Sequence, residues 1–289
     1  MRWLVTGARG MLGTDIVSEL AGRDVQGIDL EELDLTNAQA VSRFVAEQLS
    51  RGDVVVNCAA WTDVDGAEEH EELATLVNGA AAEHLAVACA EVGARLVHLS
   101  TDYVFAGDAA VPYPESAPHA PLSAYGRSKM AGEIAVRAAL PDDHVVLRSA
   151  WLYGAHGRCF PKTIAAAARE REALQVVDDQ VGQPTWTRDV ADLVVRLVEA
   201  GVPAGTYHAT SSGHTSWRGF AQEVVASAGM DPSIVAPTTS DKYPRPAARP
   251  AWSVLGHDAL LEQGIEPIAD WRARWHAAAP EVLAPRPAN

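Results

Sequence analysis

The 289-residue chain contains only three cysteines, and this scarcity limits the classes of protein to which it can belong. The three lie far apart, form no Cys-x-x-Cys pair and are odd in number, which argues against a disulfide framework and against a zinc knuckle. They are Cys58, Cys89 and Cys159. The first two lie in apolar runs, so we expect them to be buried thiols.

Long apolar runs are also missing from the sequence. No run approaches the roughly 20 residues that a membrane-spanning helix needs. The first residues form a strand-like segment and show no signal-peptide pattern. We therefore expect a cytoplasmic protein that has no membrane partner.

Basic residues are few compared with acidic ones. The chain has 23 Lys and Arg residues against 38 Asp and Glu residues, and its formal net charge is −15. Such a balance repels phosphate backbones and anionic lipids, so we expect no nucleic-acid partner. A small phosphorylated ligand is still compatible with this charge, because one pocket can be rich in backbone N–H donors.

The first half of the chain alternates between strand and helix patterns. Strands are predicted at residues 2–6, 24–29, 54–57, 95–100 and 144–149, and helices at 11–20, 38–49, 71–92 and 125–140. Strands separated by helices favour right-handed βαβ units, and hence a parallel sheet with helices on both faces. We therefore predict an α/β fold, a Rossmann-like doubly wound parallel sheet, with a dinucleotide-binding domain at residues 1–150.

The second half is less regular. Helices are predicted at residues 162–171, 190–199 and 217–228 and a strand at 205–210, and proline and glycine are dense from Pro232 to Pro250. We interpret residues 151–289 as mainly a smaller C-terminal substrate-binding lobe, with some segments that return to the first domain. The Ala- and Pro-rich tail from Ala277 is expected to be loose.

A glycine-rich turn follows the first predicted strand and begins the first predicted helix. Gly7, Gly10 and Gly13 have the spacing Gly-x-x-Gly-x-x-Gly. Glycines let a nucleotide diphosphate approach the backbone, and the helix N-terminus offers N–H groups and partial positive charge. Asp29 ends the next strand and is a candidate to bind the ribose hydroxyls of NAD. Its charge would repel a 2′-phosphate, whereas Arg9 could neutralise one, so the choice between NADH and NADPH stays open.

Tyr125 and Lys129 begin a predicted helix and are four residues apart, so they share one face of it. An ammonium beside a phenol lowers the phenol pKa, which makes tyrosine a usable general acid for an alkoxide formed by hydride addition. Lysine can also hold the nicotinamide ribose. Thr101 follows a buried strand, at the end where open α/β sheets bind ligands, and is placed to hydrogen-bond the carbonyl oxygen being reduced.

These motifs together resemble the extended short-chain dehydrogenase/reductase family, and within it the dTDP-4-dehydrorhamnose reductases. The resemblance covers nearly the whole chain. The segments that show it are the glycine turn, residues 57–65, 100–105, 125–129 with Gly132 and Glu133, 148–153, 179–185, and Arg249 with Pro250. It implies transfer of a hydride from NADPH or NADH to carbon 4 of a dTDP-4-keto-6-deoxysugar.

The resemblance also implies site residues. It implies a catalytic triad of Thr101, Tyr125 and Lys129. It implies cofactor contacts at Gly10, Met11, Leu12, Asp29, Asp34, Leu35, Ala60, Trp61 and Thr62. The glycine turn adds Gly7, Arg9 and Gly13 to the expected cofactor contacts, and the catalytic pair adds Tyr125 and Lys129. Substrate contacts are implied at Val64, Thr101, Asp102, Tyr103, Trp151, Gln180 and Arg249, where an arginine suits a diphosphate by its bidentate geometry.

Two positions distinguish between kinds of enzyme within this superfamily. Sugar-nucleotide dehydratases place two acids after the threonine, but here Asp102 is followed by Tyr103, which favours simple reduction. Some reductases of the family are magnesium-bridged dimers with an acid three positions after the Pro-Thr pair. That position is Arg188 here, so we predict no metal and not that dimer, although a homodimer of another kind is possible.

Two alternatives stay open. The substrate could be the dTDP-4-keto form of another deoxysugar, as in antibiotic pathways, because the catalytic residues contact the keto group and not the rest of the ring. The chain could also be a non-catalytic regulatory subunit with the same fold, since a fold does not determine a function.

Overall fold

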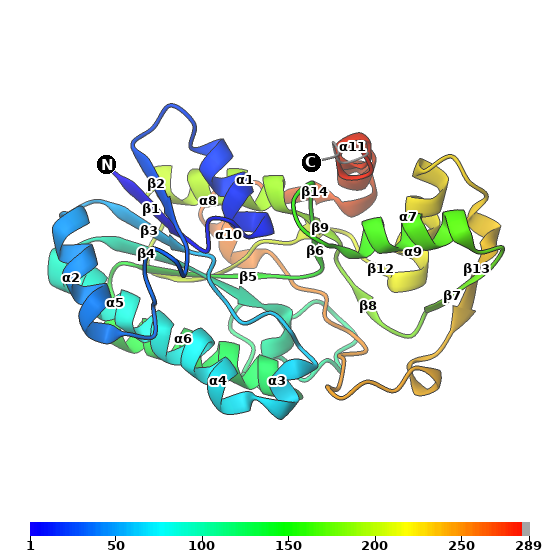
Figure 1. Cartoon of the computed structure of the whole chain (residues 1–289), viewed down its shortest axis with the longest axis horizontal. Coiled ribbons are helices and arrows are strands. Elements are labelled where there is room, and N and C mark those ends of the chain that lie inside the picture. Colours follow the sequence, from blue (N-terminus) through cyan, green and yellow to red (C-terminus); the bar gives the residue numbers. More distant parts are fainter. Residues whose placement is uncertain (285–289) are drawn as a thin grey trace.

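The computed structural model describes residues 1–284. A six-stranded sheet, in which every pair of neighbours is parallel, occupies the centre of the larger lobe (Figure 1). In spatial order its strands are β10 (Gly205–His208), β5 (His144–Ser149), β4 (Arg95–Thr101), β3 (Val54–Asn57), β1 (Trp3–Thr6) and β2 (Val25–Ile28). The predicted doubly wound parallel sheet is confirmed.

Helices cover both faces of this sheet. One face carries α1 (Met11–Glu19) and α8 (Thr187–Glu199), and the other carries α2 (Ala38–Gln48), α5 (Ala81–Val92) and α6 (Ala124–Ala139) (Figure 1). The side chains of β1 divide accordingly: Trp3 and Val5 pack toward α1 and α8, and Leu4 packs toward the opposite helices. This is the two-residue alternation of a strand that is buried on both faces.

The predicted helix at residues 71–92 is interrupted by a wider turn. It consists of α4 (Glu71–Thr75), a π-helical turn (Leu76–Ala80) and α5, and it follows the short α3 (Gly66–Glu69). By length and composition the run Glu71–Val92 could cross a membrane, at mean hydropathy 1.3, although half of its most apolar window is buried. The expectation that no apolar segment reaches that length was therefore wrong. The buried half packs alanines, Leu85 and Cys89 against the sheet.

The smaller lobe is built around a second core, to the right in Figure 1. Its main elements are α7 (Phe160–Glu170), α9 (Trp217–Ser227) and the parallel pair β7 (Leu174–Val177) and β13 (Val235–Thr238). The remaining strands are short: β6 (Leu152–Tyr153), β8 (Val181–Gly182), β9 (Thr185–Trp186), β11 (Ser211–Ser212), β12 (Thr215–Ser216) and β14 (Ile268–Asp270). The short α10 (Asp258–Glu262) packs instead against β10 and the core of the larger lobe.

The C-terminal segment departs from the sequence-based expectation. Residues from Ala277 were expected to be loose, but α11 (Trp271–Val282) continues as a helix through the first part of that stretch, to Val282. Trp271, Trp275, Ala278 and Val282 recur at helical spacing and are buried in the second core, so tertiary packing stabilises the helix. Residues 285–289 lie outside the described part of the chain.

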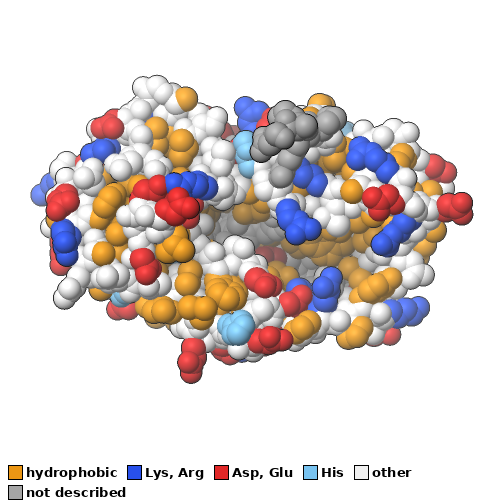
Figure 2. Space-filling model, in the orientation of Figure 1, with side chains coloured by type: hydrophobic (Ala, Val, Ile, Leu, Met, Phe, Trp, Pro, Cys, Tyr) orange, Lys and Arg blue, Asp and Glu red, His pale blue; other side chains and the backbone are white. Residues whose placement is uncertain are grey.

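Several segments of the second half contact the first. Strand β10 pairs with β5, α8 packs along α1, and residues 247–256 bond to Asp65 and to residues 107–113. All three cysteines are free thiols, and Cys89 is buried as expected, whereas Cys58 is partly exposed. Figure 2 shows a hollow at the centre of this face, between the larger and the smaller lobe, with Lys and Arg side chains on its right-hand rim.

Candidate active site

The glycine turn lies where the strand order reverses. From β1 the chain leads to β2 on one side, and then to β3 on the other side of β1. The loops that leave β1 and β3 therefore diverge, and ligands of open α/β folds bind in such a crevice. Gly7 is at φ +63°, and a Cβ there would lie 2.6 Å from the backbone nitrogen of Ala59, in the loop after β3. Only glycine is compatible with both constraints.

The last glycine of the turn has a different role. A Cβ on Gly13 would lie 2.2 Å from the carbonyl oxygen of Gly7, so glycine lets α1 pack closely against the turn. No side chain caps α1 at Gly10, and its first turn, which includes Met11 and Leu12, contains no acid. The N–H end of α1 therefore has the chemistry that an anionic diphosphate requires.

Asp29 lies directly after β2, beside the glycine turn. Its carboxylate accepts hydrogen bonds from the backbone N–H groups of Arg9, at 3.1 Å, and Leu30, at 2.9 Å. The exposed Arg9 guanidinium forms ion pairs with Glu31, at 3.2 Å, and with Glu32. Its charge is thus already partly compensated, which weakens its expected attraction for a 2′-phosphate.

The other implied cofactor contacts lie on the loops beside this turn. Asp34 is exposed, and its carboxylate accepts from the backbone and hydroxyl of Thr36. Leu35 packs against the core under α2 and α5. Ala60, Trp61 and Thr62 belong to the loop that follows β3. The structure brings both loops to the carboxyl edge of β1, β2 and β3.

Asn78 fixes the loop after β3, and its role was not predicted from the sequence. It lies in the π-helical turn and is buried. Its side chain accepts from the backbone N–H of Trp61 at 2.8 Å, and donates to the Trp61 carbonyl and to the Ser128 hydroxyl on α6. Single π-helical turns occur often at functional sites, but no sequence pattern identifies them.

The three expected catalytic residues come together at the carboxyl end of β4. Thr101 ends that strand, and its hydroxyl lies close enough to the Tyr125 phenol, in the first turn of α6, to lower the Tyr125 pKa. Lys129 follows one turn later and is almost completely buried. Its Nζ donates to the carbonyl oxygen of Leu99 at 2.6 Å, which fixes α6 against β4. Tyr125 and Lys129 thus lie one turn apart on the same helix, as the helix-face argument expected, and their catalytic role stays a prediction.

The acid–base properties of the pair differ from the expectation. Burial raises the pKa of Tyr125 to about 12, the charge of Asp102 adds to this, and the nearby Thr101 hydroxyl opposes it. Burial lowers the pKa of Lys129 to about 8, although Glu133 and Cys58 favour its charged form. The Tyr125 pKa is therefore raised in this structure and not lowered, because desolvation of the phenol dominates.

A buried charge network supports the strands beneath the site. The Glu133 carboxylate on α6 accepts hydrogen bonds from both Nε and Nη2 of Arg148 on β5, at 2.9 and 2.8 Å. The carboxylate also accepts hydrogen bonds from the side chains of Ser100 and Arg137, and it is hydrogen-bonded to His119, all within 2.8 Å. These bonds hold the pKa of Glu133 far below its usual range, against the effect of burial. The network connects α6 to β4 and β5, so it fixes Tyr125 relative to Thr101.

Two stacked tryptophans lie beyond β5. Trp151 has a φ of +46°, a strained value for a bulky residue, and such strain is typical of functional sites. Its ring stacks on Trp217, with centroids 3.6 Å apart and planes 6° from parallel. A Cβ on Gly182 would lie 2.5 Å from the Trp151 ring, so glycine is required there. Trp217 was not among the predicted site residues.

The remaining implied substrate contacts lie on three loops. Val64 follows β3 beside Asp65, and Arg249 donates to the Asp65 carboxylate at 2.9 Å. The Gln180 amide donates to the Ser240 hydroxyl at 2.8 Å. Tyr103 packs edge to face on Tyr125, with ring centroids 5.6 Å apart. Within the described residues, no contact joins the stacked tryptophans to Thr101, Tyr125 or Lys129. That both sets of residues bind one substrate therefore stays a prediction.

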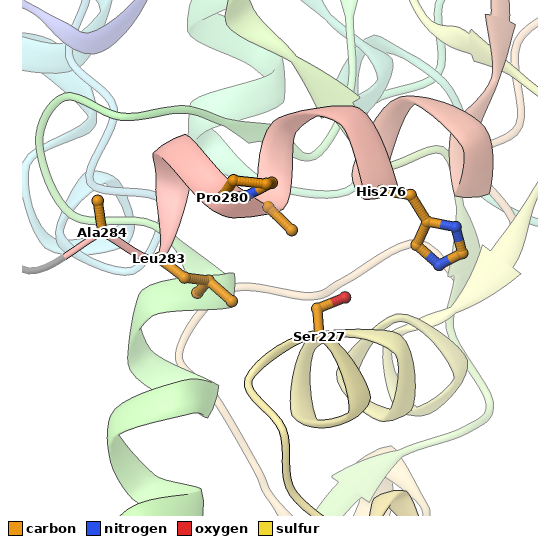
Figure 3. A pocket seen from close by; sticks show the side chains of 6 residues that line it. Ser227, His276, Pro280, Leu283 and Ala284 are labelled. Carbon is orange, nitrogen blue, oxygen red and sulfur yellow. The ribbon is translucent and has the colours of Figure 1, made fainter.

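The cavities found elsewhere do not involve these residues. One of about 620 Å³ lies between α9 and α11 and is lined by Ser227, His276, Pro280 and Leu283 (Figure 3). A second, of about 510 Å³, lies between α8 and α11. Arg188, on its wall, pairs with Glu281 at 2.7 Å. Within residues 1–284, no group of three or more His, Cys, Asp or Glu residues is arranged to hold a metal ion.

The fold and the site define an α/β protein of the extended short-chain dehydrogenase/reductase type, with a dinucleotide crevice and a Thr–Tyr–Lys group beside it. A model of the family described as RmlD substrate binding domain matches residues 1–283. The chain belongs to this family.

Individual relatives agree with that membership. The dTDP-4-dehydrorhamnose reductase of Streptomyces griseus is 48% identical over 278 residues, which cover 94% of this chain and 91% of that protein. The dTDP-4-keto-6-deoxy-D-glucose reductase of Streptomyces niveus is 47% identical over 272 residues, 93% of each. The crystal structure of dTDP-4-dehydrorhamnose reductase from Bacillus anthracis in complex with NADP has a TM-score of 0.91 at 36% identity, covering 96% of this chain and 98% of that chain.

Proposed function

We propose that the protein is an NAD(P)H-dependent reductase of a dTDP-4-keto-6-deoxysugar, with dTDP-4-dehydrorhamnose as the first candidate substrate and dTDP-L-rhamnose as its product. The observation that carries this proposal is the meeting of Thr101, Tyr125 and Lys129 at the carboxyl end of β4. The similarity to dTDP-4-dehydrorhamnose reductases along 94% of the chain supports the substrate class.

The residues present fit a dinucleotide cofactor. Gly7 and Gly13 form a cradle that a Cβ would fill, and the uncapped N-terminus of α1 supplies N–H donors for a diphosphate. Asp29 supplies a carboxylate for ribose hydroxyls, and Lys129 supplies an ammonium for the nicotinamide ribose. When bound, the reduced nicotinamide supplies the hydride for carbon 4 of the sugar.

The protein residues then handle the proton. Because burial keeps Tyr125 protonated at neutral pH, its O–H can donate to the alkoxide oxygen that forms at carbon 4. The Lys129 ammonium, held on the Leu99 carbonyl, stabilises the negative charge that appears in the site. The Thr101 hydroxyl lies beside the Tyr125 phenol and favours its ionised form, so it eases release of the proton.

Reduction fits the site better than dehydration does. A dehydratase needs a second acid or base after Asp102 to remove and return protons, and Tyr103 occupies that position. Burial raises the pKa of Tyr103 far above neutral, with Asp102 as a further cause, so the phenol cannot exchange protons readily. Tyr103 instead packs its ring on Tyr125.

The sugar itself stays a proposal, because a similar protein is named dTDP-4-keto-6-deoxy-D-glucose reductase. Incubation with a panel of dTDP-4-keto-6-deoxysugars, each with NADH or NADPH, should identify one preferred pair by product analysis. Turnover of none of them would favour the regulatory subunit instead. Other expectations also stay predictions: a homodimer, the absence of nucleic-acid and membrane partners, the absence of a metal, and the cytoplasmic location.

Substitution of the proton donor tests the mechanism. Tyr125→Phe removes one O–H and keeps the ring that packs on Tyr103, so fold and cofactor affinity should persist. Turnover should fall by a factor of about 10²–10⁴, the usual contribution of general acid catalysis. The measurement is kcat at saturating substrate, with cofactor Kd as the control. Near-normal kcat would remove Tyr125 from the mechanism.

A further inference from the structure

Asp65, the last residue of the loop between β3 and α3, holds a segment that returns from the smaller lobe after β13. Its Oδ1 atom accepts hydrogen bonds from Nη1 of Arg249, at 2.9 Å, and from the backbone N–H of Ala247, at 3.2 Å. Nη1 of Arg245 lies 3.7 Å from the other oxygen, Oδ2. Burial alone would raise the pKa of Asp65, but the hydrogen bonds from Arg249 and Ala247 hold it below its ordinary value. The carboxylate is therefore ionised at neutral pH.

The protein uses only half of the Arg249 guanidinium. Nη1 carries two protons and makes two hydrogen bonds, one to Asp65 and one to the carbonyl oxygen of Ala247 at 2.8 Å. Within residues 1–284, neither Nε nor Nη2 of Arg249 donates a hydrogen bond, although the side chain is only 20% exposed. Largely buried N–H groups without acceptors cost free energy, which points to a ligand that supplies the acceptors.

The unused Nε–Nη2 edge of Arg249 has a defined chemistry. The N–H groups along such an edge are parallel and match the spacing of two phosphate oxygens, so the edge binds a phosphate through two hydrogen bonds. Arg249 also lies beside the proposed catalytic residues. Burial raises the pKa of Tyr103, the charge of Arg249 opposes this rise, and the Tyr103 ring packs on Tyr125. A phosphate on this edge therefore lies near the group that would protonate the substrate.

We propose that Asp65 is a positioning residue that holds Nη1 of Arg249 and so directs the Nε–Nη2 edge at the diphosphate of the sugar nucleotide. This assignment rests on the proposed function. The charges agree with it, because two guanidinium groups face one carboxylate and leave local positive charge in a protein of net charge −15. The cofactor diphosphate has its own cradle at the N-terminus of α1.

Calorimetric binding of dTDP tests the proposal, because charge and geometry predict opposite results. dTDP is anionic, so removal of a nearby negative charge would by itself strengthen its binding. If Asp65 positions Arg249, Asp65→Ala should instead weaken dTDP binding about tenfold, the effect of one charge-assisted hydrogen bond. Thymidine, which has no phosphate, and NADPH should bind as they do to the wild type. Unchanged or tighter dTDP binding, or an equal loss for NADPH, would overturn the proposal.

Two further variants separate positioning from a general loosening of the loop. Asp65→Asn keeps an acceptor oxygen, so its dTDP affinity should stay within about threefold of the wild type. Arg249→Met should weaken dTDP binding by about 10–100-fold, and Asp65→Ala should cause no further loss in that background. Asp192→Ala removes the acid of an exposed ion pair with Arg196 and, as the matched control, should leave dTDP binding unchanged. A loss in Asp65→Asn equal to that in Asp65→Ala, or a full further loss in the double variant, would refute a role that acts through Arg249.

Turnover distinguishes failure of this assignment from failure of the proposed function. With a dTDP-ketosugar, Asp65→Ala should raise KM about tenfold and leave kcat nearly unchanged, because a phosphate contact is made equally before and during the reaction. If the wild type binds dTDP with the expected dependence on Asp65 but reduces no ketosugar, the proposed function fails and the assignment of Asp65 stands. If turnover is normal and Asp65→Ala changes neither KM nor dTDP binding, the proposed function stands and the assignment fails. No binding of dTDP by the wild type would refute both.

Discussion

Replacement of Lys129 by methionine should stabilise the protein while it impairs the site. Lys129 is 2% exposed, and burial lowers its pKa from 10.5 to about 8. At pH 7 the amine is protonated in both the folded and the unfolded chain, so the folded protein bears the cost of a desolvated charge. Methionine occupies a similar volume without that charge.

The magnitude follows from the pKa difference. A pKa lowered from 10.5 to about 8 corresponds to about 3 kcal/mol, at about 1.4 kcal/mol for each pKa unit. Loss of the Nζ bond to the Leu99 carbonyl costs about 1 kcal/mol. Lys129→Met should therefore raise the free energy of unfolding at pH 7 by about 2 kcal/mol.

The pH dependence gives a second check. Between pH 8 and 10.5 the unfolded chain binds more protons at this lysine than the folded chain does, so wild-type stability rises with pH over that window relative to the variant. The advantage of Lys129→Met should thus be complete below pH 8 and lost by about pH 10.5.

Urea unfolding at several pH values between 7 and 10 measures this difference. Lys242→Met, at an exposed lysine, is the matched control and should change stability little at any pH. The same Lys129→Met protein should lose most reductase activity. A variant less stable than wild type at pH 7, or a difference that does not change with pH, would show that Lys129 is not the buried, destabilising ammonium inferred here.

Two further substitutions test the cofactor and substrate sides of the crevice. Asp29→Ala should raise the NADPH-to-NADH ratio of kcat/KM about fivefold, because about 1 kcal/mol of repulsion toward a 2′-phosphate is removed; an unchanged ratio would place the acid away from the ribose. Trp217→Leu should abolish the excitonic circular dichroism signal of the Trp151–Trp217 stack and raise KM more than it lowers kcat, since its ring contacts Trp151 and not Tyr125. Loss of the signal with unchanged KM would separate the stack from substrate binding.

The regular elements of the larger lobe could be predicted because each has a strong local signal. Apolar runs such as Val54–Asn57 are buried on both faces, and the glycines at 7 and 13 are required by steric limits that any chain would obey. The two-residue strands of the smaller lobe carry no such periodicity. The C-terminal helix was missed because its composition suggested a loose tail, whereas burial of Trp271 and Trp275 stabilises it.

The site shows the same division between local and long-range information. The four-residue spacing of Tyr125 and Lys129 was enough to place both on one helix face, because helix geometry is local. Asn78 and Trp217 contact the site from segments far away in sequence, through a π-helical turn and a stacked ring, and neither contact leaves a pattern in the chain.

The direction of the hydrogen bonds at Thr101 could not be derived from the sequence either. A threonine at the end of a strand can donate or accept, and the motif alone suggested a donor to the substrate. In the fold, the carboxylate of Asp102 takes the only proton of Thr101, and the Tyr103 N–H takes one lone pair. What remains on the hydroxyl oxygen is one lone pair for a further partner. The chemistry of the site therefore depends on which partners burial leaves for a single hydroxyl group, and this is a property of the packed structure.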